Sequence, residues 1–345
     1  MKYYAGLDVS LEKTSICVVD GDGVIVAERK VASEPRAIGE ALRAMGLVFE
    51  RVGLEAGPLS PWLHDALHSE GLPAICIETR RMKAALRAMR NKTDRNDARG
   101  IAQVMRTGWF RFVHVKSSES QELRLVLNHR KTLQRKTLDI ENEIRGTLKA
   151  FGLKLGKVSR GGFTARVGAL VADRSRLRSA TEPMLKARDA LMAEFDRLHR
   201  MVLEVVRGDP LCHRLMTIPG VGPVTALAFK TGVDVPERFA KSKTVGAHFG
   251  LTPRKFNSGE IDVNGRISKC GDAMVRMLLH EAANALLTRC TRNSALKAWA
   301  MRIAKTRGKK RAKVALARKL AVIMHRMWLD GSEFRWSDKA SAATH

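Results

Sequence analysis

Four acidic residues of this sequence have the types and spacing that metal chemistry requires. Asp94 and Asp97 lie three positions apart in NKTDRNDARG, so on a helix their carboxylates share one face. Asp8 lies inside an otherwise apolar run, YAGLDVS, and Glu55 ends another, FERVGLE. A carboxylate in such surroundings costs free energy unless it is paired or binds a metal ion.

These four carboxylates are a candidate metal site. Brought together without a cation, they would raise one another's pKa until some of them bound protons. We therefore expect Asp8, Glu55, Asp94 and Asp97 to bind Mg²⁺, with Mn²⁺ as the alternative ion, and to serve phosphoryl transfer. For any one acid, a salt bridge to a nearby arginine is the simpler interpretation. The order strand, strand, helix favours metal for the whole set.

A second group of reactive residues lies in GLTPRKFNSGEIDVNGRISKCGDAMVR (250–276). Two serines, Ser258 and Ser268, lie among five cations: Arg254, Lys255, Arg266, Lys269 and Arg276. Clustered cations stabilise the charge that develops when a hydroxyl attacks a phosphate. A Ser-Gly turn that binds phosphate passively fits the same residues and is the commoner case. From the residues alone, both interpretations stay open for both serines.

The elements that position the acids are predicted by periodicity. Alternating apolar residues over 3–31, interrupted by GDG, predict three short strands with a hairpin. A helix (35–45), the strand ending at Glu55, a helix opened by prolines (58–71) and a strand (73–78) follow, and then helices that carry RRMKAALRAMR and TDRNDARGIAQVMRTG. This order predicts a mixed sheet with helices packed on it, an α/β fold.

The rest of the chain is predicted to be mostly helical. In 117–207, Leu191, Phe195, Leu198, Val202 and Val205 form a coiled-coil-like seam, and a looser stripe contains Leu133, Ile140, Ile144 and Phe151. Self-association and two ordinary packed helices both fit this pattern. From 208 onward we expect a helix, a tight turn and a helix around IPGVGPVTA, a loop region over 250–272, and helices at 274–287 and 314–328. The predicted domains are 1–116, 117–207 and 208–330, with a polar tail at 331–345.

Charge indicates the partner. The 345 residues include 62 Lys and Arg against 35 Asp and Glu, a net charge of +27, with a dense run at 302–313. Such an excess favours nucleic acid. An apolar content of 45% argues against wholesale disorder. Besides the five cations around the serines, we expect these residues to contact nucleic acid: Lys92, Arg95, Gly220, Gly222, Lys309, Lys310 and Arg311. The two glycines would do so through backbone N–H groups.

Cysteine usage and apolar runs predict the compartment. The five cysteines are scattered, with no CxxC pair, which favours reduced thiols over a disulfide framework or a zinc site. The sequence has no apolar signal core at its start and no apolar run long enough to span a bilayer. We expect a cytoplasmic protein without a membrane partner, associated with the nucleoid when it is bound to DNA.

Taken together, these motifs resemble a known family. A strand-borne Asp, a strand-end Glu and a helical Asp-x-x-Asp look like the RuvC-like branch of the ribonuclease H fold. The context NKTDRNDAR, with IPGVGPVTA and GLTPRKFNSG…GRISKCGD, resembles the DEDD transposases of the insertion-sequence-110 family, over residues 3 to about 330. One departure is EAGP after the strand, where the family often has Glu-Ala-Thr-Gly; Glu55 itself is in place.

The resemblance implies a mechanism. It implies a RuvC-like domain, a coiled-coil insert and a C-terminal domain with a helix-hairpin-helix-like motif, in which Ser258 matches the nucleophile. It also implies a covalent 5′-phosphoserine intermediate, acids and serine that meet between protomers of a dimer or tetramer, and a structured guide RNA that pairs with donor and target DNA.

Other classes of function fit the sequence less well. An actin-like kinase shares the opening strand, Asp and hairpin, but it needs further Gly-rich phosphate loops that the sequence lacks. A non-catalytic nucleic-acid-binding protein would have lost some of the four acids. A metal-dependent junction nuclease would use the acids alone, and the C-terminal unit with Ser258 favours recombination over it.

Overall fold

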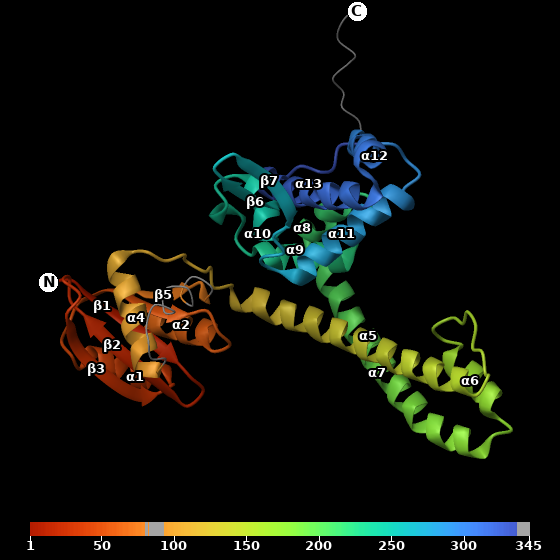
Figure 1. Ribbon diagram of the computed structural model, residues 1–345, viewed down its shortest axis with the longest axis horizontal. Helices are drawn as coiled ribbons and strands as arrows, with labels where there is room; N and C mark the ends of the chain where they lie inside the picture. The colour runs from red at the N-terminus through yellow and green to blue at the C-terminus, as the bar shows by residue number, and fades with distance from the viewer. Residues whose placement is uncertain (80–81, 83–92, 337–345) are drawn as a thin grey trace, which may run out of the picture. The chain divides into compact units, whose positions relative to one another are not determined.

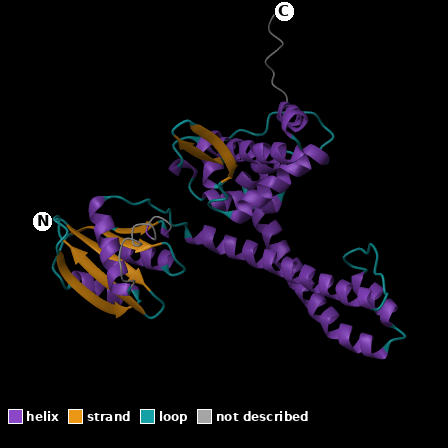
Figure 2. Ribbon diagram, viewed as in Figure 1, coloured by secondary structure: helices purple, strands orange, loops and turns teal. Residues whose placement is uncertain are grey.

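The computed structural model describes residues 1–79, 82 and 93–336 and divides the chain into two compact units, Met1–Lys116 and Ser117–His345. The first unit contains a five-stranded sheet with helices (Figure 1). The second is mostly helical, with one two-stranded hairpin (Figure 2). The predicted α/β class with a following helical region is confirmed.

The sheet of the first unit is mixed. Its strands are β1 (Tyr3–Val9), β2 (Lys13–Val19), β3 (Ile25–Ala32), β4 (Phe49–Glu55) and β5 (Ala74–Ile77), in the spatial order β3-β2-β1-β4-β5. The first three form an antiparallel meander, whereas β4 and β5 run parallel to β1. The carboxyl ends of β1 and β4 therefore lie side by side, at the same end of the sheet.

Helices cover both faces of this sheet. On one face, α1 (Pro35–Arg43) and α2 (Ser60–Ser69) bury Leu42 and Leu63 against Leu7 and Leu54 of the central strands. On the other face lies α4 (Asp94–Thr107), whose Ala98, Ile101 and Ala102 pack with Tyr4 and Cys17. Because side chains alternate along a strand, every second residue of β1 counted from Tyr4 faces α4.

Two long helices open the second unit. They are α5 (Ser118–Ala150) and α7 (Ser175–Arg207), with the short α6 (Phe163–Val171) between them. Glu141 of α5 binds Arg188 of α7 at 2.7 Å, and Arg130, eleven residues earlier, meets His199, eleven residues later. The two helices therefore run antiparallel and pair with each other within one chain (Figure 1).

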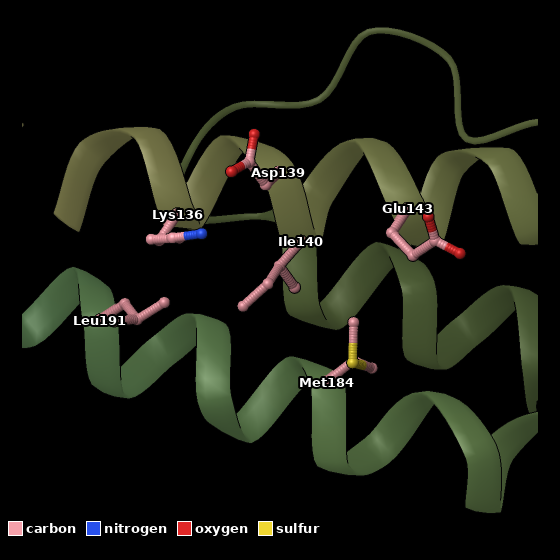
Figure 3. Close-up of a pocket in the computed structure, with 6 residues that line it drawn as sticks. All are labelled: Lys136, Asp139, Ile140, Glu143, Met184 and Leu191. Atoms are coloured by element: carbon pink, nitrogen blue, oxygen red, sulfur yellow. The ribbon is translucent and has the colours of Figure 1, made fainter. Parts of the chain in front are cut away.

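The predicted seam lies partly in this helix pair. Phe195 and Val202 are buried, and the guanidinium of Arg130 stacks on the Phe195 ring at 4.5 Å. In the groove between the helices, Ile140 points toward α7 and Met184 toward α5 (Figure 3). The predicted apolar stripe on α5 was wrong in its last residue. Phe151 is 48% exposed at the C-cap of α5, and Leu148, three residues earlier, is buried instead.

The remaining helices share one core. They are α8 (Pro210–Met216), α9 (Pro223–Val233), α10 (Val245–His248), α11 (Ala273–Thr288), α12 (Ala295–Arg307) and α13 (Lys309–Asp330), with 3-10 turns at Pro236–Arg238 and Ser242–Thr244. Leu127 of α5 and Val202 and Val206 of α7 belong to the same core. The long helix pair is thus anchored in this core at one end. Phe334, beyond α13, also packs on it.

One predicted element was wrong. The region 250–272 was expected to be a loop, but it contains an antiparallel hairpin of β6 (Pro253–Ser258) and β7 (Ile261–Ile267). A two-residue turn joins the strands, and Gly259 within it has φ +56°, which a glycine adopts without strain. Phe256 and Val263, which pair across the hairpin, are both exposed. The hairpin has no buried face, so its sequence lacks the alternation of apolar and polar residues that usually identifies a strand.

No helix in the part of the chain that the structure describes is long and apolar enough to cross a membrane.

Candidate active site

Asp8 and Glu55 lie at the carboxyl ends of neighbouring parallel strands. Leu7 of β1 and Leu54 of β4 form the last residue pair between these two strands, and each acid comes directly after its member of that pair. Both acids are half-buried. By alternation they lie on the same face as Gly6 and Gly53, which is the face covered by α4.

Two glycines let α4 lie very close to the sheet. A Cβ on Gly6 would come within 2.2 Å of the Ala98 carbonyl oxygen, and one on Gly53 within 2.5 Å of Met105 Cγ. The sheet therefore needs residues without side chains under this helix. At the far end, Gln103 Nε2 donates to the Gly23 carbonyl at 2.7 Å, in the turn between β2 and β3. Helix α4 thus runs antiparallel to β1.

This direction puts the first turn of α4 over the strand ends that carry the other two acids. Thr93 caps the helix by accepting a hydrogen bond from the Asn96 N–H at 3.2 Å. Asp94 and Asp97 lie in the first turn, where the helix dipole favours negative charge. The stripe of α4 that carries Asp97 continues through Ile101, which packs over Gly53. All four predicted acids therefore belong to one end of one face of the sheet.

The donor set fits a hard divalent cation. Carboxylate oxygens are the ligands that Mg²⁺ and Mn²⁺ prefer, and half-buried strand ends hold such groups in place. Among residues 1–79, 82 and 93–336, however, no three His, Cys, Asp or Glu side chains are arranged to hold a metal ion. That Asp8, Glu55, Asp94 and Asp97 share one ion stays a prediction.

Two residues on β3 that the sequence analysis missed contact the acid-bearing turn. Lys30 Nζ lies 3.1 Å from Asp94, with both side chains more than half exposed. Glu28 accepts hydrogen bonds from Arg95 Nε at 2.8 Å and from Arg99 Nε at 2.7 Å. These bonds lower the pKa of Glu28 to about 2. The sequence contains only the local part of this signal: Arg95 and Arg99 are spaced i, i+4, and Glu28 and Lys30 alternate on one strand. Nothing in the sequence pairs the two segments.

The basic residues predicted beside the acids differ in what the structure says of them. Arg95 is bound to Glu28, yet its side chain is 67% exposed. Lys92 lies outside the described residues. Arg95 therefore has one carboxylate partner and also a surface open to solvent, and its contact with nucleic acid stays a prediction.

Ser258 lies at the tip of the hairpin in the second unit. It is the last residue of β6, pairs with Ile261 across the turn, and is exposed, as is every residue of β6. Phe256, two positions earlier and so on the same face, is 58% exposed. Ser268 lies beyond the hairpin, half-buried, and its Oγ accepts a hydrogen bond from the Cys270 N–H at 3.4 Å. The hydroxyl of Ser258 is the more accessible of the two.

The five cations predicted around the serines fall into two groups. Arg254, Lys255, Arg266 and Lys269 are exposed on or beside the hairpin. Of these, Lys255 is paired with Asp262 at 3.3 Å. Arg276 is half-buried, and its Nη1 donates to the carbonyl oxygens of Phe249 and Cys270 at 3.0 and 2.9 Å. Arg276 thus holds the base of the hairpin loop in place.

The glycine turn between α8 and α9 has the predicted helix-turn-helix order. Gly220 has φ +89°, and a Cβ there would lie 2.5 Å from the Ala282 carbonyl oxygen of α11. This glycine is therefore explained by packing. Gly222 caps α9 in open space, where a Cβ would meet nothing within 4 Å, and its N–H stays a candidate for a phosphate contact.

The predicted basic run forms a corner between α12 and α13, with Gly308 (φ +82°) between the helices. The exposed cations of this corner, which we call the basic corner, are Arg302, Lys305, Arg307, Lys309, Lys310 and Arg311. None of them pairs with a carboxylate among the residues that the structure describes. Three of them lie in the first turn of α13, where the helix dipole disfavours positive charge. A bound polyanion would offset this unfavourable interaction.

Comparison with known proteins agrees with both halves of this description. A transposase family model, for the DEDD transposases of the IS110 type, matches residues 5–152, and a second, described as the transposase IS116/IS110/IS902 family, matches residues 212–300. The first covers the acid-bearing sheet and α4, and the second covers the serine hairpin. The fold and these matches define the chain as a transposase, an enzyme that acts on DNA.

Individual relatives carry the same description. The transposase for insertion sequence element IS1111A of Coxiella burnetii is 29% identical over 328 residues, which are 92% of this chain and 87% of that protein. A probable family 20 transposase of Pseudomonas aeruginosa is 31% identical over 240 residues, 68% of this chain and 71% of that protein. The chain belongs to the IS116/IS110/IS902 family of transposases. Its DEDD domain implies a divalent metal ion.

Proposed function

We propose that this transposase cleaves and exchanges strands between donor and target DNA by means of both groups of residues. The acids Asp8, Glu55, Asp94 and Asp97 would hold Mg²⁺, which supplies charge neutralisation at the scissile phosphate. The observation that carries the proposal is the shared placement of these four residues: two end neighbouring parallel strands, and two lie in the helix turn above the same face.

Ser258 is the proposed nucleophile. Its Oγ forms a bond to phosphorus while the bond from phosphorus to the 3′ oxygen breaks, which leaves a 5′-phosphoserine and a free 3′ hydroxyl that takes up a proton. Exposure at the hairpin tip gives the hydroxyl access to DNA, and Arg254 and Arg266 would stabilise charge on the phosphate oxygens. Reversal of the step onto a second 3′ hydroxyl would complete the exchange.

The proposal includes two partners besides DNA. A structured guide RNA would select donor and target by base pairing, which leaves the protein to bind backbones through its basic surfaces, among them the basic corner. Self-association as a dimer or tetramer would bring the acids and serines of different protomers to the same phosphates. Both partners rest on the resemblance to the family and on the net charge of +27.

A junction-type nuclease is the alternative. In that case the acids and metal would hydrolyse DNA with water, and Ser258 would only bind phosphate.

A strand-exchange assay separates the two functions. Purified protein, RNA transcribed from the flanks of the element, donor DNA, target DNA and Mg²⁺ are combined, with Asp94→Ala and Ser258→Ala in parallel. We expect joined donor–target product from the wild type alone and only when RNA is present. Cleavage without joining, unchanged in Ser258→Ala, would support the nuclease.

A further inference from the structure

Strand β3 holds the acid-bearing turn of α4. Glu28 and Lys30 are alternate residues of β3, and in the strand register they lie level with Gly6 and Asp8 of β1, respectively, across β2. Both therefore face α4. Glu28 binds Arg95 and Arg99, one on each side of Asp97, and Lys30 binds Asp94.

The glycine contacts and the polar bonds restrain α4 in different ways. Gly6 and Gly53 set how close the helix comes to the sheet, because backbone and side-chain atoms of α4 lie directly on them. Apolar packing is non-directional, whereas hydrogen bonds are directional and so restrain the sliding and rotation of a helix. Polar bonds at the two ends supply that restraint: Gln103 and Arg106 reach the carbonyl oxygens of the β2–β3 turn, and Arg95 and Arg99 reach Glu28.

We propose that Glu28 is a positioning residue of the active site, which fixes the first turn of α4 through Arg95 and Arg99 and so sets Asp94 and Asp97 for the metal ion. This inference rests on the proposed metal-binding role of the acids. Glu28 acts through the two arginines and needs no contact with metal or DNA.

Glu28 rather than Lys30 carries this role because of burial and bonding. The Glu28 side chain is 19% exposed and accepts charge-assisted bonds from two guanidinium groups of one helix. The Lys30–Asp94 pair is a single contact with both partners more than half exposed, and such pairs contribute little. Removal of a group that is hydrogen-bonded directly to a metal ligand typically weakens metal binding by about 10-fold to 100-fold, and because Glu28 acts through two arginines we expect its effect at the lower end of this range.

The test is Glu28→Gln in the full-length protein, with Mn²⁺ as the probe ion and its binding followed by electron paramagnetic resonance. We expect Mn²⁺ affinity to fall by about 10-fold or more. Amide hydrogen exchange should accelerate at residues 96–99 and stay unchanged in α1 and α2. Glu50→Gln is the matched control, because it makes the same charge change at the exposed Lys2–Glu50 pair and should leave both readouts unchanged.

A second variant separates position from charge. Glu28→Gln leaves two unpaired cations near the acids, which by itself would repel a metal ion. The double variant Glu28→Gln/Arg95→Gln restores the local net charge but does not restore the bonds between Glu28 and the two arginines. If position matters, Mn²⁺ binding stays weak in the double variant; recovery to the wild-type affinity would overturn the inference.

Asp94→Asn in the same series distinguishes the two possible failures. If Asp94→Asn loses Mn²⁺ binding but Glu28→Gln binds normally and exchanges normally, the positioning role is wrong and the metal site stands. If Asp94→Asn binds Mn²⁺ like the wild type, the metal site is wrong. Hydrogen exchange in Glu28→Gln then still decides whether Glu28 fixes the turn.

Discussion

The acid-bearing end of the sheet and the serine hairpin are built in opposite ways. Asp8 and Glu55 end central strands that are buried on both faces, and the helix above them is held by glycine contacts and by the arginine bonds to Glu28. Ser258 lies at the tip of two strands in which every residue of β6 is exposed. The roles proposed for the two regions fit this difference, because metal ligands gain from fixed geometry and a nucleophile that reaches into DNA gains from access. An isolated two-stranded hairpin is marginally stable, so we expect bound DNA to help fix its position.

The largest expected effect is on catalysis. Asp94→Asn removes a proposed charged metal ligand, and DNA cleavage in the presence of Mg²⁺ and guide RNA should fall by about 10³-fold or more. Cleavage is measured on labelled donor DNA by denaturing gel. Asp65→Asn, an exposed acid of α2 on the opposite face of the sheet, is the matched control and should cleave normally. Equal activity of the two variants would remove the basis for calling the acid end an active site.

The second largest effect is expected on stability, because the two regions should differ in how well they tolerate a Gly→Ala substitution. Gly6→Ala drives a Cβ into the α4 backbone, and we expect it to lower the free energy of unfolding of the first unit by about 3 kcal/mol or more. In the hairpin, the new Cβ of Gly265→Ala would lie 2.9 Å from the edge of the exposed Phe256 ring, which can rotate, and 3.6 Å from the Arg254 carbonyl oxygen, an ordinary contact. Its cost should stay below about 1 kcal/mol. Urea unfolding measures both, and similar costs would show that the acid end is not as tightly packed as described.

The basic corner should affect binding more than chemistry. Neutralisation of Lys309, Lys310 and Arg311 to Gln should weaken binding of duplex DNA about 10-fold and reduce the slope of log affinity against log salt by about 2 to 3. Fluorescence anisotropy over a salt series measures both. A triple variant of the cations that already pair with glutamates, Arg36, Lys186 and Arg197, matches the charge change and should have a smaller effect. Equal slopes would mean that only total charge matters.

The smallest expected effect is that of acid on the bonds that Glu28 forms with Arg95 and Arg99 of α4. The pKa of Glu28 is lowered from 4.5 to about 2 by the bonds from Arg95 and Arg99, so the folded state favours the ionised form. Its stabilisation is complete above pH 4.5 and is lost as the pH falls toward about 2. The difference in free energy of unfolding between wild type and Glu28→Gln should therefore narrow over this range. A difference that is constant with pH would mean that the charge of Glu28 does not matter.

Much of the first unit follows from the sequence because its signals are local. Alternation predicted the strands, and the spacing of Asp94 and Asp97 predicted a shared helix face. Polar bonds between distant segments were not predictable in this way: Glu28 and Arg95 are 67 residues apart, and only the register of β3 under α4 brings them together. The role of Gly6 was hidden for the same reason.

The hairpin was missed for a different physical cause. A strand is recognised when one face is buried, and both faces of 253–258 are exposed. The Gly-containing turn after Ser258 was the only local signal. The basic run, by contrast, was correctly assigned to an exposed surface, although α13 begins at Lys309, five residues before the predicted helix.

The most direct test of the account is the identification of the DNA-linked residue. Wild type, Ser258→Ala, Ser268→Ala and Asp94→Asn are incubated with donor DNA, target DNA, RNA transcribed from the flanks of the element and Mg²⁺. The reactions are denatured and digested, and nucleotide-linked peptides are mapped by mass spectrometry. We predict a 5′-phosphate linked to the peptide that contains Ser258, in the wild type and in Ser268→Ala, and no linked peptide in Ser258→Ala. If Ser258→Ala still cleaves DNA while Asp94→Asn does not, and the wild type forms no linked peptide, the enzyme is a metal-dependent nuclease and the serine assignment is wrong.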